Sequence, residues 1–403
     1  MNNNLYFCCV IILFFNIFVV LNAFNLENSE PYSLYPYKIT KIAELKNIHQ
    51  LTVSLDQKHL FVGSNTSIYH LNLVWSLNLL GVSTLSAHPD YIINHSLINP
   101  TGVWLHNTSL YVRTNTTILS YDNILNKTKD QIPYLKPTIV KFLNPCHFFN
   151  YIKFGSSDLL YSTQSYIQNN TSVNYIVSFN KTGQSFNILE HGSVFAFNST
   201  NNGFFIDNQY SFNSSISDPS CKFSGLSFIK NLPHQFHNSS TSLRSHPIGC
   251  NSHIFGLSFS NQRLPLADGF FKHNTVLVPF FNSGKVSIVD LSPNSTIHND
   301  RIVVTGWCNS SHPCHGPVDV FLLQDSSFLV SDFYGNIYWV HYYSYGNLAI
   351  FIFIIFAILV LAIFFLIIFV PSICMFCNIF YSRNKYISSE FSPLLSPYSP
   401  SIL

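Results

Sequence analysis

Segments of alternating apolar and polar residues fill the chain between residues 51 and 340. One example is GVWLHNTSLYVRTNTTILSYDNI, residues 102–124, in which short polar turns separate three runs rich in Val, Ile, Leu and Tyr. A period of two places successive side chains on opposite faces of a β-strand. Because no helical pattern of any length interrupts the region, the sequence predicts an all-β domain.

The strand pattern recurs six times at intervals of about 50 residues, the length of a four-stranded propeller blade. The copies occupy residues 51–73, 102–124, 151–183, 193–208, 256–291 and 317–340. We therefore predict a six-bladed β-propeller, with a seventh blade or a β-sandwich as the alternative. Asp207 in IDN and Asp332 in SDFYGN are expected to be turn-forming residues first and ligands second.

A secretory signal peptide is predicted over residues 1–23, where the apolar run LYFCCVIILFFNIFVVLNA ends on Ala23. The residues before this run carry no cation apart from the amino terminus, so an uncleaved signal anchor is the alternative.

A transmembrane helix is predicted over residues 347–371. Its centre, Leu348 to Val370, is 23 residues without a charge or a hydrogen-bonding side chain, and it spans roughly 35 Å at about 1.5 Å per residue. Arg383 and Lys385 follow it, as is typical of a cytosolic flank. We expect a single-pass type I membrane protein of the cell surface or of endolysosomal membranes. Residues 24–346 would form a lumenal or extracellular propeller, and residues 372–403 a disordered cytosolic tail.

Charged residues make up only 9% of the chain, against about a quarter in an average soluble protein. The net charge of +2 excludes the large basic face that nucleic-acid binding needs. N-linked glycans would supply the missing solubility. Acceptor sequences occur at thirteen positions between the two apolar runs: Asn65, Asn94, Asn107, Asn115, Asn126, Asn169, Asn170, Asn180, Asn198, Asn213, Asn238, Asn294 and Asn309.

Five cysteines lie in the region expected to be lumenal, where the compartment favours disulfides. We predict the pairs Cys308–Cys314 and Cys221–Cys250, which leave Cys146 without an assigned partner. The segment CNSSHPCH also has the residue types of a zinc site, but a short disulfide loop is favoured and we predict no metal site. Cys374 and Cys377 follow the membrane helix, where we expect reversible palmitoylation.

The predicted tail contains EFSPLL, in which Glu390 precedes Leu394 and Leu395 with the spacing of an acidic dileucine sorting motif. An extended hexapeptide of this kind can place a carboxylate in a basic site and two leucines in adjoining apolar pockets. We therefore predict that adaptor proteins bind the tail.

Several repeats together resemble a known family. The opening ITKIAELKNIHQLTVSLDQKHLFVGSNTSIYHLNL, the third repeat HFFNYIKFGSSDLLYS and the last repeat GPVDVFLLQDSSFLVSDFYGNIYWV are similar to blades of the glucose/sorbosone dehydrogenase family. This family consists of soluble quinoprotein six-bladed propellers. The resemblance covers most of residues 39–341 and implies the same fold.

The resemblance also implies a chemistry: oxidation of a sugar hydroxyl by bound pyrroloquinoline quinone (PQQ), with calcium polarising the quinone. In the family a histidine eight residues before a glycine of the third blade acts as general base, and His147 stands at that distance from Gly155. On this match His147 is the candidate catalytic base, and an imidazole has a suitable pKa.

Other residues depart from the family pattern. His191 and Gly192 stand where the fourth blade usually carries an Arg-Asn pair, and PFFNSG replaces a polar strand of the fifth blade. Cationic donors for the quinone carboxylates and acidic ligands for calcium are therefore scarce. We predict a divergent, non-catalytic propeller that needs no cofactor and binds carbohydrate or protein ligands. The alternative is a membrane-tethered, quinone-dependent sugar oxidoreductase that uses His147, PQQ and calcium.

Overall fold

A computed structural model describes two compact units, Met1–Tyr343 and Ser344–Leu403. The described residues are 31–77, 83–93, 99–142, 151–155, 159–168, 171–179, 185–190, 192–197, 203–207, 223–229, 245–250, 253–260, 264–266, 269–270, 274–291, 297–308, 315–342 and 345–390.

The first unit is a six-bladed β-propeller, which confirms the predicted fold. Blades 1 to 3 are four-stranded antiparallel sheets. Their strands are β3 (Ile48–Val53), β4 (His59–Ser64), β5 (Ile68–Leu77) and β6 (Ser83–Ile93); β7 (Gly102–His106), β8 (Ser109–Arg113), β9 (Thr117–Tyr121) and β10 (Thr138–Phe142); and β11 (Ile152–Phe154), β12 (Leu160–Gln168), β13 (Thr171–Phe179) and β14 (Ser185–Glu190). Two 3₁₀ turns, η1 (Ile124–Asn126) and η2 (Ile132–Tyr134), lie between β9 and β10.

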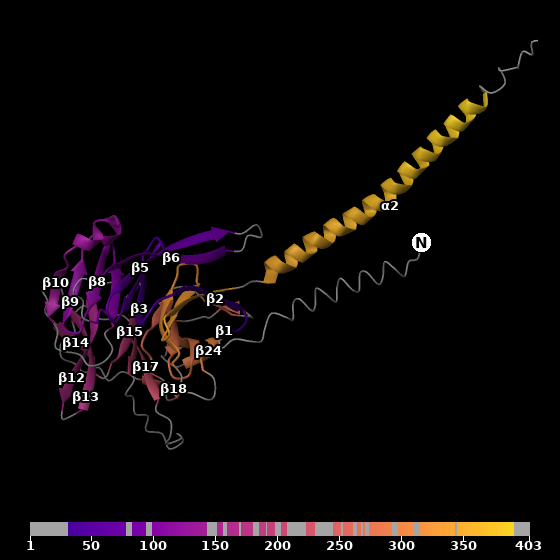
Figure 1. Ribbon diagram of the computed structural model, residues 1–403. Helices are drawn as coiled ribbons and strands as arrows, with labels where there is room; N and C mark the ends of the chain where they lie inside the picture. Colours follow the sequence, from indigo (N-terminus) through magenta and orange to yellow (C-terminus); the bar gives the residue numbers. More distant parts are fainter. Residues whose placement is uncertain are drawn as a thin grey trace, which may run out of the picture. The chain divides into compact units, whose positions relative to one another are not determined.

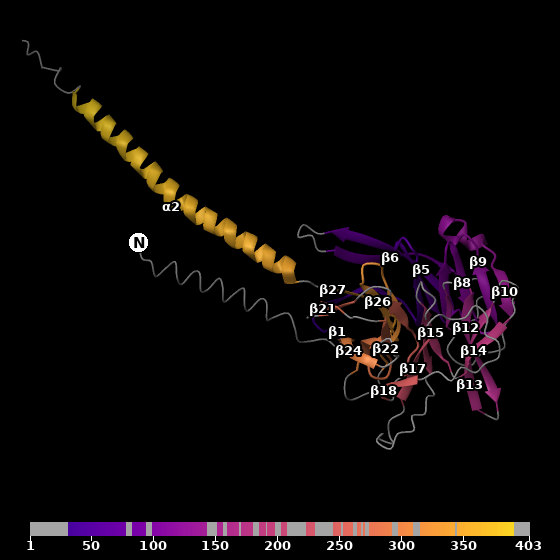
Figure 2. The same cartoon turned by 180° about the vertical axis from the view of Figure 1, so that it is seen from behind.

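Blades 4 to 6 complete the ring, and the sheets follow one another around the unit in chain order (Figures 1 and 2). Their strands are β15 (Val194–Phe197), β16 (Gly203–Asp207), β17 (Phe223–Ile229) and β18 (Ser245–Cys250); β19 (Ser258–Ser260), β22 (Asn274–Phe280), β23 (Lys285–Leu291), β24 (Ile297–Thr305) and β1 (Tyr32–Ser33); and β25 (Pro317–Leu322), β26 (Phe328–Asp332), β27 (Asn336–Tyr342) and β2 (Tyr37–Glu44). A small hairpin of β20 (Pro265–Leu266) and β21 (Gly269–Phe270) lies between β19 and β22.

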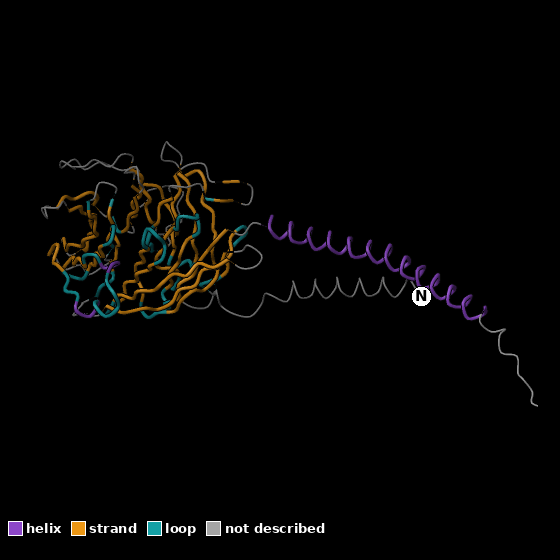
Figure 3. The backbone as a smooth tube through the Cα atoms, turned by 90° about the horizontal axis from the view of Figure 1, so that it is seen from above, coloured by secondary structure: helices purple, strands orange, loops and turns teal. Residues whose placement is uncertain are grey.

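The N-terminal strands close the ring by joining blades formed at the other end of the propeller sequence. Strand β2 pairs with β27 from Tyr37↔Tyr342 to Glu44↔Asn336, and β1 adds a fifth strand to blade 5 beside β24. A ring of separate sheets joined in this way leaves only short, protected sheet edges. In the view from above, the first unit consists almost entirely of strands and connecting loops (Figure 3).

The innermost strands β3, β7, β11, β15, β19 and β25 contact one another in sequence around the axis. They run in the same direction, because inter-blade contacts advance in step along them: Gln50 Oε1 accepts from Val103 N, and Thr52 Oγ1 accepts from Leu105 N two residues later. We call the end at which these strands begin the upstream face, and the end at which they finish the downstream face.

The last β-turn of the propeller shows how the turns are built. The Asp332 carboxylate accepts hydrogen bonds from Asn336 N at 2.8 Å and from Trp307 Nε1 at 3.2 Å. Gly335 has a φ of 96°, and a Cβ there would lie 2.7 Å from the carbonyl carbon of Leu45. The prediction that Asp332 forms a turn is therefore confirmed, whereas the side chain of Asp207 lies outside the description.

The described residues of the second unit form the helix α2 (Tyr345–Glu390), which is long and apolar enough to cross a membrane. It includes Pro371 and continues through residues 372–390, for which disorder was expected. Apolar side chains continue past the predicted span, among them Ile373, Phe376 and Ile379, which accounts for the longer helix. Leu394 and Leu395 lie outside the described residues.

Candidate functional site

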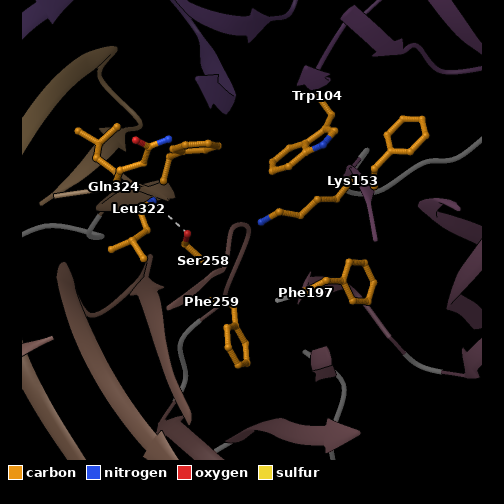
Figure 4. Close-up of a pocket in the computed structure, with 10 residues that line it drawn as sticks. Trp104, Lys153, Phe197, Ser258, Phe259, Leu322 and Gln324 are labelled. Atoms are coloured by element: carbon orange, nitrogen blue, oxygen red, sulfur yellow. Dashed lines mark hydrogen bonds between the residues drawn. The ribbon is translucent and has the colours of Figure 1, made fainter. Parts of the chain in front are cut away.

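An aromatic pocket opens near the propeller axis at the downstream end of the inner strands, with a volume of about 250 Å³ (Figure 4). Five of the six blades contribute to it. Its lining residues are Trp104, Lys153, Phe154, Phe197, Ser258, Phe259, Phe321, Leu322, Leu323 and Gln324. Seven of these ten residues are apolar, and Lys153, Ser258 and Gln324 supply the polar groups. Small-molecule sites commonly combine the two kinds of lining.

The aromatic rings of the pocket come from different blades. The Trp104 and Phe321 ring centroids are 5.9 Å apart, so blades 2 and 6 both contribute large flat surfaces. His106 stacks on Phe154 with centroids 4.1 Å apart, and Tyr111 meets the same ring edge-on at 4.6 Å. Because Phe154 is held by two neighbours, this side of the pocket is well ordered by packing.

Lys153 is the one cationic side chain among the pocket-lining residues, and only 6% of it is exposed. Its Nζ lies 4.7 Å from the Trp104 ring centroid, in a cation–π contact, and donates to the carbonyl of Leu257 at 3.3 Å. Burial lowers the pKa of Lys153 to about 8, and the nearby Asp319 carboxylate opposes this shift.

Asp319 lies at the inner wall of the propeller and is 1% exposed. Its Oδ2 accepts a hydrogen bond from Leu51 N at 2.7 Å, but its buried Oδ1 has no hydrogen-bond partner. Burial raises the pKa of Asp319 to about 7, against the opposing effects of the Leu51 N–H and Lys153. The close approach requires Gly256, because a Cβ there would lie 2.6 Å from the Asp319 Cα.

Two further polar side chains cross-link the inner strands here. Gln50 is 2% exposed, donates to Ile152 O at 2.7 Å and accepts from Val103 N at 3.2 Å, so it joins blades 1, 2 and 3. The Tyr151 hydroxyl donates to the same Leu257 carbonyl at 3.1 Å, and burial together with the Asp319 charge raises its pKa. These bonds hold the wall behind the pocket in place.

The upstream face presents a different group of side chains. His253, Phe255, Phe281, His315 and Phe333 form a chain of ring contacts between blades 5 and 6, and Phe333 is half exposed. Backbone bonds from Phe281 N to His253 O and from Gly316 N to Phe281 O hold the loops together.

These upstream residues do not fit PQQ and calcium. The quinone carries three carboxylates, which call for guanidinium or ammonium donors, whereas this cluster supplies phenyl and imidazole rings. Within the described ranges, no group of three or more His, Cys, Asp or Glu side chains could hold a metal ion. His147 and its neighbour Cys146 lie outside the described residues, so the assignment of the base stays a prediction.

The other predicted sites are only partly within the description. Asn65, Asn107 and Asn126 are exposed and Asn115 is partly exposed, whereas the remaining nine acceptor asparagines lie outside the described residues. Their modification stays a prediction.

Among the predicted disulfide residues, Cys308 takes part in a disulfide whose partner lies outside the described residues. Cys221 and Cys314 also lie outside them, as does the side chain of Cys250, so the predicted pairings are untested. At the C-terminus, Glu390 is the last residue of α2.

The pocket was not predicted from the sequence. Lys153 and Asp319 are each a lone charge inside an apolar strand, in YIKF and PVDVF. Burying a charged side chain costs folding free energy unless a partner compensates it, so such positions indicate a functional or structural role. The two lone charges could therefore have indicated a site. That Lys153 and Asp319 lie near Trp104 could not be predicted, because it depends on closure of the ring.

No protein family matches the sequence of this chain, and no curated protein matches it. The fold is similar to two solved structures, an iodide and a calcium structure, of Trichoderma reesei Carbohydrate-Active Enzymes Family AA12. Both have a TM-score of 0.56 and 11% identity over 79% of this chain, and they are covered to 99% and 98% of their own length. It is also similar to the PQQ domain of pyranose dehydrogenase from Coprinopsis cinerea, with a TM-score of 0.50 and 12% identity over 78% of this chain and 98% of that one. At these identities the likeness shows a PQQ-dehydrogenase-like propeller fold alone.

Proposed function

We propose that this chain is a type I membrane glycoprotein whose dehydrogenase-like propeller binds carbohydrate without catalysing its oxidation. The observation that carries the proposal is the pocket at the downstream face, where Trp104, Phe154 and Phe321 surround a small cavity with Lys153 and Gln324 at its wall. A divergent member of the glucose/sorbosone dehydrogenase family would in this way keep the propeller and use another part of it.

The chemistry of the pocket suits a sugar ring. One face of a pyranose exposes C–H groups, which carry partial positive charge and pack against the electron-rich face of an aromatic ring. Hydroxyl groups at the ring edge need hydrogen-bonding partners when they leave water. The Lys153 ammonium supplies donors at the pocket wall. The Gln324 amide, whose Nε2 donates to Leu55 O at 2.8 Å, keeps a second N–H and its oxygen for a ligand. A cavity of about 250 Å³ accommodates one sugar ring and is too small to enclose several linked sugars.

The test is direct binding. Full-length protein in lipid nanodiscs would be titrated calorimetrically with a panel of neutral and acidic monosaccharides, and Trp104→Ala is expected to reduce the affinity at least tenfold. Tyr134→Ala is the matched control, because Tyr134 is 84% exposed on η2 and does not line the pocket.

Trp104 also packs against the neighbouring core, so each variant is checked by thermal unfolding. Gln324→Ala, at an exposed position of the rim, provides a second variant that leaves the core intact. If folded wild-type protein binds no sugar of the panel, the proposal is rejected, and a protein ligand becomes the next hypothesis.

A second candidate function is a membrane-tethered, quinone-dependent sugar oxidoreductase with His147 as general base. The fold it shares with the pyranose dehydrogenase PQQ domain favours it, whereas the described upstream side chains do not. Titration of the same preparation with PQQ and calcium, followed by dye reduction with sugars, tests it. Quinone binding with turnover that His147→Ala abolishes would establish the enzyme, and a folded protein that binds no quinone would exclude it.

The remaining features of the proposal concern sidedness and sorting. We propose that residues 1–23 are removed as a signal peptide, that α2 crosses the membrane and that the propeller lies outside the cytosol. In this arrangement Cys374 and Cys377 would be available for palmitoylation. Glu390, Leu394 and Leu395 would be available to adaptor proteins of the endolysosomal route.

A further inference from the structure

Lys153 is an unusual residue for a pocket that holds only neutral ligands. Its ammonium has three N–H donors, and the structure gives it one hydrogen bond, the 3.3 Å contact to Leu257 O. The Trp104 ring covers another side of the charge. Within the described part of the chain, Lys153 forms no ion pair. A buried ammonium with this set of contacts retains donor capacity toward the cavity that it lines.

The nearest countercharge is held away from the cavity. Asp319 does not line the pocket, because its Oδ2 is bound to Leu51 N and its side chain lies against Gly256. The carboxylate therefore acts on Lys153 through space, without occupying the ammonium. The pocket combines an aromatic wall, which suits the C–H face of a ring, with one buried cation, which suits an anion.

We infer that the ligand of this pocket is an acidic monosaccharide unit, with its ring on Trp104 and its carboxylate on the Lys153 ammonium. The inference rests on the proposed carbohydrate function and narrows it to hexuronates and similar sugar acids. A charge-assisted hydrogen bond to carboxylate is about twice as strong as a neutral one, and a buried ammonium gains most from such a partner. Gln324, on the exposed rim, would contact the ring hydroxyls.

The charge of the site depends on pH through the groups that face Lys153. Asp319 and Tyr151 are these groups, and Tyr151 stays neutral because burial raises its pKa. Asp319 has its pKa raised to about 7, and Lys153 stays protonated below about pH 8. As the pH falls from 7.5 to 5.5, Asp319 takes up a proton and the site gains one positive charge. Affinity for a carboxylate that is ionised at both values is therefore expected to rise several-fold.

The experiment compares glucuronate with glucose on full-length protein in nanodiscs, by calorimetric titration at pH 5.5 and 7.5. Wild-type protein is expected to bind glucuronate at least tenfold more tightly than glucose at pH 5.5, with a smaller ratio at pH 7.5. Lys153→Met should remove the preference, because it lowers the affinity for glucuronate far more than the affinity for glucose.

Lys136→Met is the matched control, because Lys136 is exposed in the connection before β10 and does not line the pocket. Equal affinity of wild-type protein for the two sugars, or a preference that survives in folded Lys153→Met, overturns the inference and leaves the carbohydrate proposal standing. Binding of neither sugar nor any other member of the panel overturns both. Because the first comparison uses wild-type protein alone, it decides the question even if Lys153→Met does not fold.

Discussion

Asp319 Oδ2 accepts a hydrogen bond from the backbone N–H of Leu51 at 2.7 Å, and this bond joins the inner strand of blade 6 to that of blade 1. The two residues are 268 positions apart in the chain. The same carboxylate leaves Oδ1 buried without a hydrogen-bond partner and influences the Lys153 charge at the pocket. One side chain therefore contributes both to closing the ring and to the electrostatics of the proposed site.

Asp319→Ala is expected to destabilise the propeller by about 2 kcal/mol, because it leaves the buried Leu51 N–H without an acceptor. Asp319→Asn keeps an acceptor of nearly the same shape and removes a buried carboxylate, so this variant should lose clearly less folding stability than Asp319→Ala. Thermal unfolding of the full-length protein at pH 7.5 measures the difference. Equal unfolding temperatures for the two variants would show that the bond to Leu51 contributes nothing.

Gly256→Ala tests the packing around the same carboxylate. A Cβ at this position would overlap Asp319, with its Cα only 2.6 Å away, so either strand β25 or the loop before β19 must move. Overpacking of this kind is expected to cost about 3 kcal/mol, measured by thermal unfolding. Gly155→Ala is the comparison: its added Cβ would meet the Tyr161 ring at 2.9 Å, and a ring can shift more easily than backbone. A smaller loss at Gly256 than at Gly155 would contradict this account.

The blades could be predicted from the sequence because their information is local. Each repeat alternates with a period of two and turns at polar residues such as Asp332, whose carboxylate caps the turn to Asn336. Closure of the ring, in contrast, depends on long-range pairing. Tyr37 pairs with Tyr342 because the two ends of the domain meet in space, and no local pattern in residues 37–44 predicts that pairing.

The pocket depends on the same long-range closure. Lys153, Trp104 and Phe321 belong to three blades, and each occupies an ordinary position in its own strand. A lone charge inside an apolar strand indicates that something compensates it, but the sequence does not say which distant residue does so. The family resemblance implies a site at His147 instead, a residue outside the described part of the chain.

The acceptor asparagines provide a test of sidedness. Asn107 and Asn126 lie in turns at the downstream face of blade 2, where both are exposed. If the propeller is lumenal, each Asn→Gln change is expected to remove one glycan from protein expressed in a eukaryotic secretory pathway, as an increase in gel mobility. Asn123→Gln, at an exposed position of the same blade that is not followed by the acceptor pattern, is the control. Protein that shows no mobility change after enzymatic deglycosylation would place the propeller on the other side of the membrane.

A histidine pair on blade 1 predicts that the propeller loses stability in acid. His70 is buried, its Nε2 lies 3.0 Å from His59 Nδ1, and its Nδ1 lies 3.2 Å from Asp90 Oδ2, while Tyr91 stacks on the ring. Burial, with His59 as a further cause, lowers the pKa of His70 to about 4, although Asp90 opposes the shift. The bond between the two imidazoles also needs one nitrogen to accept, so a second proton on the pair breaks it.

The His70 pKa is about 6.5 in the unfolded chain and is lower in the folded protein, so the unfolded chain binds the proton more tightly. The propeller therefore has its full stability above pH 6.5 and loses stability as the pH falls toward the folded pKa. Between pH 7 and pH 5 the loss from His70 is expected to be about 2 kcal/mol. His70→Phe keeps a ring between Tyr91 and Phe61 and should make the unfolding temperature less dependent on pH over this range. His88→Gln, at an exposed position on the neighbouring strand β6, is the control and should keep the wild-type dependence. If His70→Phe and wild-type protein lose stability in parallel from pH 7 to pH 5, the buried pair is not the source of the acid sensitivity.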